Sequence, residues 1–428
     1  MSVRRLSAVD AQTYWLSAKI PNDQFLLYGF AGAVADVDDA LRRVRERACG
    51  CDELRLRVRD RNTLTYPDWV SGEVGGDQFV VHDTDNWSEC LSAIARLDGD
   101  QLDASVMAWR LHCFPSVSGL PEAERGTVAV LQIAHALADG VRASALAAWL
   151  FGRDVPVSAV DGPRRFIGAT LPWRSFRAAR THRQLVRDTE AGRVPAQADT
   201  CPALRSNARP DGRIGLRTLV RKRFEVPGPT VTVGVLAAVA TALAEHLREL
   251  GDDPSQLRAE VPMARAGERR SHNHFGNVGV GLYPDVPVGE RMARIAEQFG
   301  QRRRRASHPA MVAAGEAFAA VPAPLLRWGV AQFDPAVRSP TVTGNTVVSS
   351  VNRGAADLRF GDAPVVLTAG YPGLSPMMGL SHGVHGIGDM IAISVCAAES
   401  AIGDIDVYVE RLDAALSDDG VSTRRRTL

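Results

Sequence analysis

The chain has 428 residues, of which 45% are hydrophobic and 23% are charged. That length is enough for two or three average domains, and the composition is typical of a globular protein. Lysine and arginine total 50 against 49 aspartates and glutamates, so the net charge is +1, which argues against nucleic acid as the main partner.

The six cysteines form no metal-binding pattern. They are scattered, apart from Cys49 and Cys51, and have no zinc-site spacing, so no metal is predicted. We interpret them as reduced thiols of a cytoplasmic protein, with disulfides as the alternative. Residues 1–12 have no apolar core and do not resemble a signal peptide. The most apolar windows, 127–151 and 231–245, carry charged residues and are not convincing membrane spans; peripheral contact with a membrane stays open.

Strands and helices alternate in the first 150 residues, which predicts an α/β layer structure. A short N-terminal helix is expected within 3–16, where Ser7 and Asp10 are candidate caps. Apolar and alternating patterns predict strands and amphipathic patterns predict helices, with strands at 25–31, 53–60 and 107–114 and helices at 37–48 and 87–97.

The centre of this half is the stretch from Thr127 to Gly140, TVAVLQIAHALADG. Its apolar first half is typical of a buried strand, and the Ala/Leu-rich residues 141–150 predict a helix. His135 therefore lies where a strand ends, and Asp139-Gly140 predicts a turn and helix start. A general base beside the free amides of a helix N-terminus suits acyl transfer. The pattern alone leaves open a histidine that is merely hydrogen-bonded within the fold.

A change of composition predicts the domain boundaries. Residues 152–213 combine prolines and glycines with one basic helix, and we interpret them as a crossover between a domain at 1–151 and another at 214–428. The second half restarts the α/β pattern, with helices at 232–250, 288–307 and 405–416 and strands at 216–226, 257–263, 275–283, 341–351, 363–369 and 389–398.

The central stretch resembles a known active-site motif. Ala134-His135-Ala136-Leu137-Ala138-Asp139-Gly140 is similar to the H-H-x-x-x-D-G motif of bacterial wax ester synthase/acyl-CoA:diacylglycerol acyltransferases. That family lies within the superfamily of condensation domains and chloramphenicol acetyltransferase. Weaker resemblances follow in the same order, at Leu6 to Ala11, Met107 to Arg110, Val261 to Met263 with Phe275 to Asn277, Thr346 to Val351, and Ser375-Pro376.

The resemblance implies an α/β fold of two chloramphenicol acetyltransferase-like domains packed as a V, with a central tunnel. It implies that His135 acts as the general base in acyl transfer from acyl-CoA or an acyl-carrier protein to an alcohol or amine, with no permanently bound cofactor. Asp139 would brace the loop by pairing with an arginine, for which Arg265 is the guess, and Gly140 would leave space at the oxyanion. Candidate substrate contacts are Asn277, Trp109, Ser349 and His382. A turn or ladder role is the alternative for Asn277.

Several positions depart from the family pattern. The first motif histidine is Ala134, the N-D pair of the long second-half helix is Thr232-Val233, and the S-N-V-P-G-P segment is Ser349 to Gly354. These departures leave the base in place but put lipid substrates in doubt. Two alternatives follow: a condensation-type catalyst that forms an ester or amide from carrier-bound substrates, and a degenerate, non-catalytic binding module. The pair His272 and His274 is interpreted as part of a loop.

Overall fold

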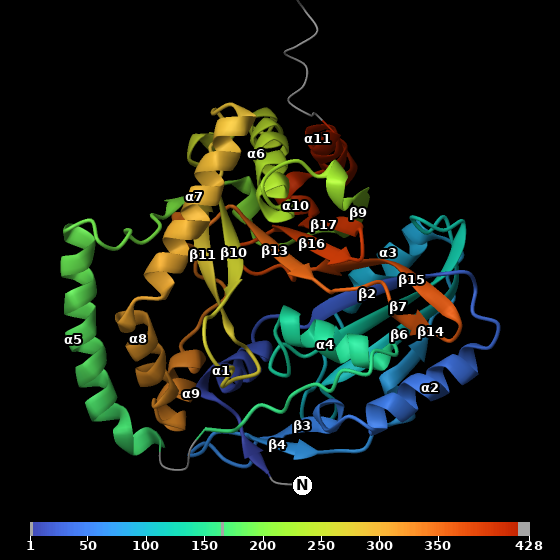
Figure 1. Ribbon diagram of the computed structural model, residues 1–428, viewed down its shortest axis with the longest axis horizontal. Helices are drawn as coiled ribbons and strands as arrows, with labels where there is room; N and C mark the ends of the chain where they lie inside the picture. Colours follow the sequence, from blue (N-terminus) through green and yellow to red (C-terminus); the bar gives the residue numbers. More distant parts are fainter. Residues whose placement is uncertain (1–2, 164–166, 418–428) are drawn as a thin grey trace, which may run out of the picture.

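The computed structural model describes residues 3–163 and 167–417, and the outermost parts of the predicted domains and three crossover residues lie outside these ranges. Figure 1 shows two α/β halves, one above the other. The sheet of the first half has the strand order β14-β15-β2-β7-β6-β5, and that of the second half has the order β11-β10-β13-β16-β17-β9.

The first half follows the predicted alternation. Its sheet consists of β2 (Gln24–Ala31), β5 (Phe79–Val81), β6 (Trp109–Ser118), β7 (Arg125–Ile133), β14 (Arg359–Phe360) and β15 (Ala363–Tyr371). Its helices are α1 (Ala8–Ser17), α2 (Val37–Cys49), α3 (Trp87–Leu97) and α4 (Gly140–Leu150). A small sheet at the base joins β1 (Arg4–Arg5), β4 (Asp68–Ser71) and β3 (Leu56–Arg59). The predicted strand at 53–60 is shorter, because residues 52–55 form a 3₁₀ turn.

The second half is built around α6 (Val231–Glu249). Its strands are β9 (Ile214–Lys222), β10 (Arg258–Ala264), β11 (Phe275–Gly281), β13 (Thr346–Asn352), β16 (Leu380–Ile387) and β17 (Met390–Ala398), and its other helices are α7 (Val288–Ala306), α10 (Glu399–Ile402) and α11 (Ile405–Ser417). By length and composition α6 could cross a membrane, but 72% of that window is buried in the protein. It is the core helix of this half.

A side layer connects the halves. It contains α5 (Leu171–Glu190), α8 (Pro309–Ala319) and α9 (Ala323–Ala331). The pair β8 (Cys201–Pro202) and β12 (Thr341–Val342) lies beside the start of β13, where Nδ2 of Asn345 donates to the carbonyl of Pro202 over 2.9 Å. Figure 1 shows α5 as the outermost element on the left, beside α8. The sequence predicted α5, but it missed α8 and α9.

The two halves exchange chain segments. Residues 359–371 lie between β13 and β16 of the second half in sequence, but β14 and β15 belong to the first sheet, where β15 pairs with β2. The boundary at 214–428 is therefore wrong for this segment. The sheets meet where Gly383 of β16 faces Gly370 of β15: a Cβ added to Gly383 would lie 2.1 Å from the Gly370 carbonyl oxygen. Only glycine allows this close approach, and the halves diverge from there as a V (Figure 1).

Candidate active site at the turn between β7 and α4

The structure confirms the predicted strand, turn and helix start around His135. Strand β7 ends at Ile133, two residues before His135, and α4 begins at Gly140. Asp139 is the N-cap of α4, and its Oδ1 accepts a hydrogen bond of 2.9 Å from the backbone N–H of Arg142. Such a cap satisfies one of the free amides at a helix start. The imidazole is therefore held between the end of a core strand and the beginning of a buried helix.

Three side chains from other elements hold the turn itself. Nδ2 of Asn273 donates to the carbonyl of His135 over 2.8 Å, Nδ1 of His272 lies 2.7 Å from the carbonyl of Leu137, and Gln24 binds the carbonyl of Ala138. His272 also stacks on Trp69, with ring centroids 5.0 Å apart. These contacts fix the turn without any contribution from a side chain at position 134, where this chain has alanine.

Asp139 braces the loop that covers the turn. Oδ2 accepts hydrogen bonds from Nη1 of Arg269 over 2.8 Å and from the backbone N–H of His274 over 2.9 Å, and Oδ1 accepts a second bond from Arg269 over 3.2 Å. Burial alone would raise the pKa of Asp139, but the bonds from Arg269, Arg142 and His274 lower it, so the carboxylate is charged. The structural interpretation of Asp139 agrees with this geometry. The guess that Arg265 is its partner is wrong, because Arg269 occupies that place.

Asp10 anchors the same loop from the other side. Its buried carboxylate accepts bonds from the backbone N–H groups of His272 and Asn273, over 3.0 and 2.9 Å, and from the hydroxyl of Ser7 over 2.7 Å. Ser7 is the N-cap of α1, and it was one of the two candidate caps predicted for this helix. Residues 272–274 lie in a loop, as expected, and that loop orients the His135 turn. Sequence analysis had matched Ser7 and Asp10 to the family without giving them this role.

The environment of His135 keeps its imidazole neutral. The side chain is partly buried and stacks on Phe275 of β11, with centroids 5.7 Å apart and planes at 14°. Burial lowers the pKa of His135, while its own backbone carbonyl and the charge of Asp139 oppose that shift. Nδ1 is buried and has no geometric hydrogen-bond partner among the described residues. A neutral imidazole is the form that accepts a proton.

Strand β13 brings the second half against the helix start. A Cβ placed on Gly140 would lie 3.2 Å from Cγ2 of Val351, so glycine keeps this junction uncrowded. Ser349 is two residues earlier on β13 and therefore shares the face of Val351, and its side chain is partly exposed. Two of the departures from the family pattern also meet here, since the hydroxyls of Thr232 and Ser350 are 2.9 Å apart.

Three other residues were predicted to contact the substrate. The contact of Asn277 stays a prediction, and the structure contradicts those of Trp109 and His382. Asn277 is exposed on β11, two residues beyond Phe275 and on the same face, and its amide binds Glu260. Trp109 is fully buried, and its indole N–H donates to the carbonyl of Leu54 over 2.7 Å. His382 is also fully buried, with its two ring nitrogens bound to Thr346 and Tyr408. Trp109 and His382 therefore contribute to packing, and neither can contact a substrate in this structure.

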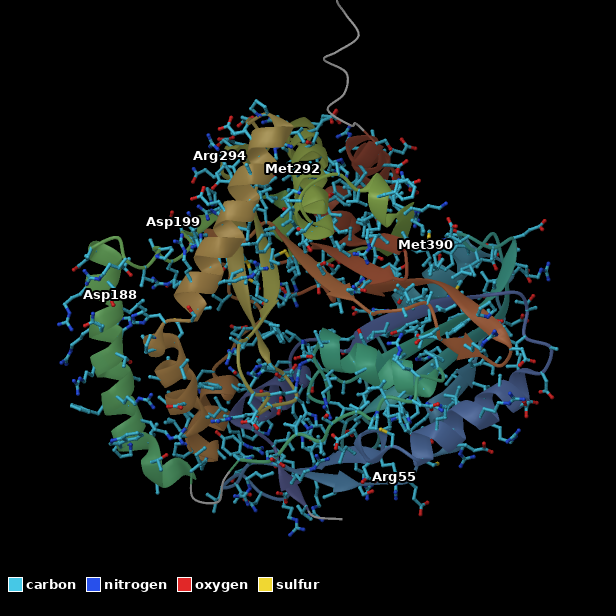
Figure 2. The ribbon with its side chains drawn as sticks, in the orientation of Figure 1. Arg55, Asp188, Asp199, Met292, Arg294 and Met390 are labelled. Atoms are coloured by element: carbon cyan, nitrogen blue, oxygen red, sulfur yellow. The ribbon has the colours of Figure 1, made fainter. Side chains whose placement is uncertain are left out.

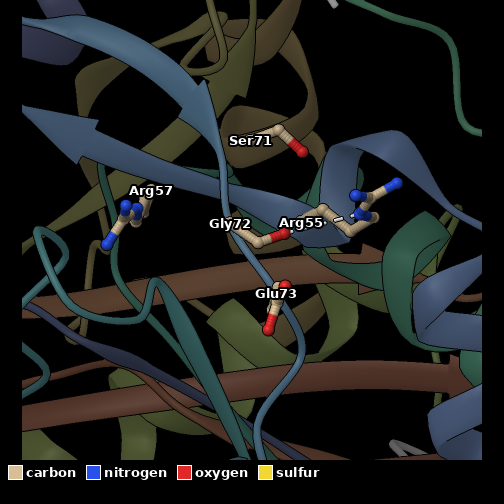
Figure 3. A pocket seen from close by; sticks show the side chains of 5 residues that line it. All are labelled: Arg55, Arg57, Ser71, Gly72 and Glu73. Atoms are coloured by element: carbon tan, nitrogen blue, oxygen red, sulfur yellow. Dashed lines mark hydrogen bonds between the residues drawn. The ribbon is translucent and has the colours of Figure 1, made fainter.

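Two surface hollows lie away from this turn. The first hollow lies on the small sheet and has a volume of about 610 Å³. Figure 3 shows the residues that line it, Arg55, Arg57, Ser71, Gly72 and Glu73. The other, of about 310 Å³, is lined by His82, Asp83, Thr84, Asp85, Pro115, Ser116, Ser118 and Arg125. Neither is lined by His135, Asp139 or Gly140, so the tunnel implied by the resemblance stays a prediction.

The structure is similar to solved structures of acyltransferases and condensation domains, whereas the sequence has no match among family models or curated proteins. No protein-family model matches the sequence, and no curated protein matches it. The structure is similar to that of the wax ester synthase/diacylglycerol acyltransferase from Marinobacter aquaeolei VT8, with a TM-score of 0.62 over 96% of this chain and 98% of that one, at 18% identity. The chain has the condensation-domain fold.

Two condensation domains document the same likeness. The starter condensation domain of rhizomide synthetase, in complex with C8-CoA and Leu-SNAC, has a TM-score of 0.56 over 97% of this chain and 93% of that one, at 15% identity. The condensation domain of the monacolin K polyketide synthase has a TM-score of 0.55 over 97% of both chains, at 12% identity. The structural similarity extends over at least 96% of this chain in all three comparisons, and it confirms the predicted α/β fold.

Proposed function

We propose that this protein is an acyltransferase that moves an acyl group from a thioester to a hydroxyl or amine acceptor, with His135 as general base. One observation carries the proposal: a neutral, partly accessible imidazole is fixed by its backbone beside the first amides of α4. The likeness to acyltransferase and condensation-domain structures supports the same reaction class.

The proposed reaction needs no covalent enzyme intermediate. Nε2 of His135 takes the proton from the acceptor O–H or N–H while the acceptor atom bonds to the thioester carbonyl carbon. The resulting oxyanion is stabilised by backbone N–H groups at the start of α4, near Gly140. The C–S bond then breaks, and the leaving thiolate takes the proton back from the imidazolium. A base at this position contributes about 10²–10⁴ in rate.

The donor and acceptor are defined as chemical classes. The complexes of the rhizomide synthetase domain with C8-CoA support a CoA thioester as donor, and an acyl-carrier protein is the other form of the same chemistry. We assign O-acylation first and amide formation second.

All six cysteines are free thiols, which supports a cytoplasmic location.

The second candidate is a non-catalytic module that binds a thioester without consuming it. The positions that favour it are Ala134, Thr232 and Ser350, where the family motifs are lost. Against it stands the neutral His135, since a protein that only binds has no need of a positioned base.

The test follows thiol release from acyl-CoA donors and loaded carrier proteins, with alcohols or amines as acceptors. We expect His135→Ala to lower turnover about 10²–10⁴-fold with its stability unchanged. His182→Ala is the matched control, because His182 is an exposed residue of α5. Wild-type turnover in His135→Ala would refute the base. Donor binding in the wild type with no thiol release under any pairing would establish the binding module.

A further inference from the structure

Exposed apolar side chains are concentrated on the side layer of the molecule. Eighteen large apolar side chains are exposed among residues 3–163 and 167–417, and nine of them lie on α5, α8, α9 and the segment that follows α9. They include two tryptophans, Trp173 at 63% and Trp328 at 62% exposure. The nine, which we call the apolar face, are Trp173, Phe176, Val186, Met311, Val312, Leu325, Trp328, Phe333 and Val337.

Helix α5 is mostly exposed, whereas α9 packs its inner side against the first half. Leu185 is the one buried residue among the twenty of α5. Figure 2 shows α5 outside the two sheets. Asp188 lies near the C-terminal end of α5, and from there the chain returns toward the second half at Asp199 (Figure 2). Together α8 and α9 are apolar enough for a membrane span, but they are bent by 96° at the break between them. A helix pair of that composition, bent and half exposed, suits the surface of a bilayer.

Arginines are frequent on α5 and in the last turn of α7. Helix α5 carries five, Arg174, Arg177, Arg180, Arg183 and Arg187, against two acidic residues. The last turn of α7 adds Arg303, Arg304 and Arg305. Nη1 of Arg305 donates to the hydroxyl of Thr189 over 3.3 Å, so this run lies beside the end of α5. The whole chain has a net charge of +1, and the excess of positive charge here is therefore local.

We propose that the apolar face docks on the surface of an anionic lipid bilayer, with its tryptophans and Phe176 among the headgroups and the arginines of α5 and α7 on lipid phosphates. Tryptophan beside arginine is the composition of membrane-interface helices. An acidic protein would neutralise the arginines, but it would leave nine apolar side chains without an apolar partner. The proposal does not depend on the acyl-transfer reaction.

The position of this face links it to the candidate active site. Helices α8 and α9 contact α1, and Asp10 of α1 holds the loop that fixes the His135 turn. A bilayer on the apolar face would thus lie one helix away from the loop.

The experiment is co-flotation of the full chain with phosphatidylcholine vesicles, with and without phosphatidylglycerol, followed by tryptophan emission. We expect binding to the anionic vesicles, a blue shift on binding and weaker binding at high salt. The variant Trp173→Ser/Phe176→Ser/Trp328→Ser is expected to bind at least tenfold more weakly. Reversing the charge of Arg180 or of Arg183 is expected to weaken binding about fivefold or more for each position.

The matched control is Phe224→Ser, which removes an 81% exposed aromatic side chain outside the apolar face and is expected to bind as the wild type does. Melting curves identify any variant that fails to fold. Wild-type binding by the triple variant would overturn the proposal, as would a wild-type protein that floats with neither vesicle. Concentration-dependent self-association that the triple variant abolishes, without vesicle binding, would assign the face to a second copy instead. None of these measurements uses a thioester, so they are independent of the test of acyl transfer.

Discussion

The ion pair of Asp139 and Arg269 is expected to stabilise the fold rather than take part in proton transfer. Asp139→Ala removes both bonds to Arg269 and leaves the N–H groups of Arg142 and His274 without their acceptor. Breaking a buried pair costs about 3–5 kcal/mol, of which the lost N-cap accounts for about 1 kcal/mol. The side chain of Arg269 is 27% exposed. We therefore expect Arg269→Ala to lower the free energy of unfolding by about 3 kcal/mol, near the lower end of that range.

A double-mutant cycle by denaturant unfolding measures the pair directly. We expect a coupling energy of about 2 kcal/mol between Asp139 and Arg269. Arg270→Ala is the matched control, because its ion pair with Glu268 is exposed on both sides, and it should change stability by less than about 0.5 kcal/mol. A coupling below about 0.5 kcal/mol would refute the brace. Loss of activity in Asp139→Asn, with full stability and a changed pH profile, would instead make Asp139 a partner in catalysis.

The lowered pKa of Asp139 also fixes a direction of pH dependence. A carboxyl whose pKa is depressed in the folded state contributes stability above its unfolded pKa of about 3.9. That contribution is lost as the pH falls through the folded value, which is lower. Wild-type stability should therefore fall more steeply than that of Asp139→Asn below about pH 4, as acid titrations followed by circular dichroism would measure.

Three further predictions concern neighbouring residues. The pKa of His135 is lowered, so kcat/KM should stay constant on acidification until the pH is below about 6.5; a fall centred above pH 7 would contradict this. Gly140→Ala should lower kcat/KM about tenfold by crowding Val351, and Val351→Ala in the same chain should restore it, whereas a loss that persists would exclude crowding. His382→Leu should cost about 1–3 kcal/mol in thermal unfolding and leave KM unchanged; an altered KM would return His382 to the substrate site.

The part of the site that is local in sequence was predictable from the residues. A β-branched run, a helix-favouring run and an Asp-Gly pair between them define the strand, the cap and the helix around His135, because each depends on neighbours a few residues away. The partner of Asp139 was not predictable in this way. Arg269 lies 130 residues further along the chain, in a loop without periodicity, and only the folded chain brings the two together.

Glycine explains why part of the second half was misjudged. The segment Leu380 to Ile387 contains two glycines and two histidines, a composition that weakens a strand prediction, and it is absent from the strands predicted for the second half. It forms the fully buried β16. Gly383 is required there by the approach of β15, and His382 is satisfied by Tyr408, so contacts between distant elements set these residues.

The exchange of β15 between the halves also constrains the order in which the protein can fold during synthesis. The hydroxyl of Thr368 binds the carbonyl of Leu27, 341 residues away. A nascent chain that has emerged only as far as the crossover has β2 with one edge unpaired, and an unpaired edge strand is a site for wrong association. The first half can therefore complete its sheet only after residue 371 has been synthesised. We therefore expect a fragment that ends near residue 213 to lack the β15 partner of β2 and to leave that edge of the first sheet exposed.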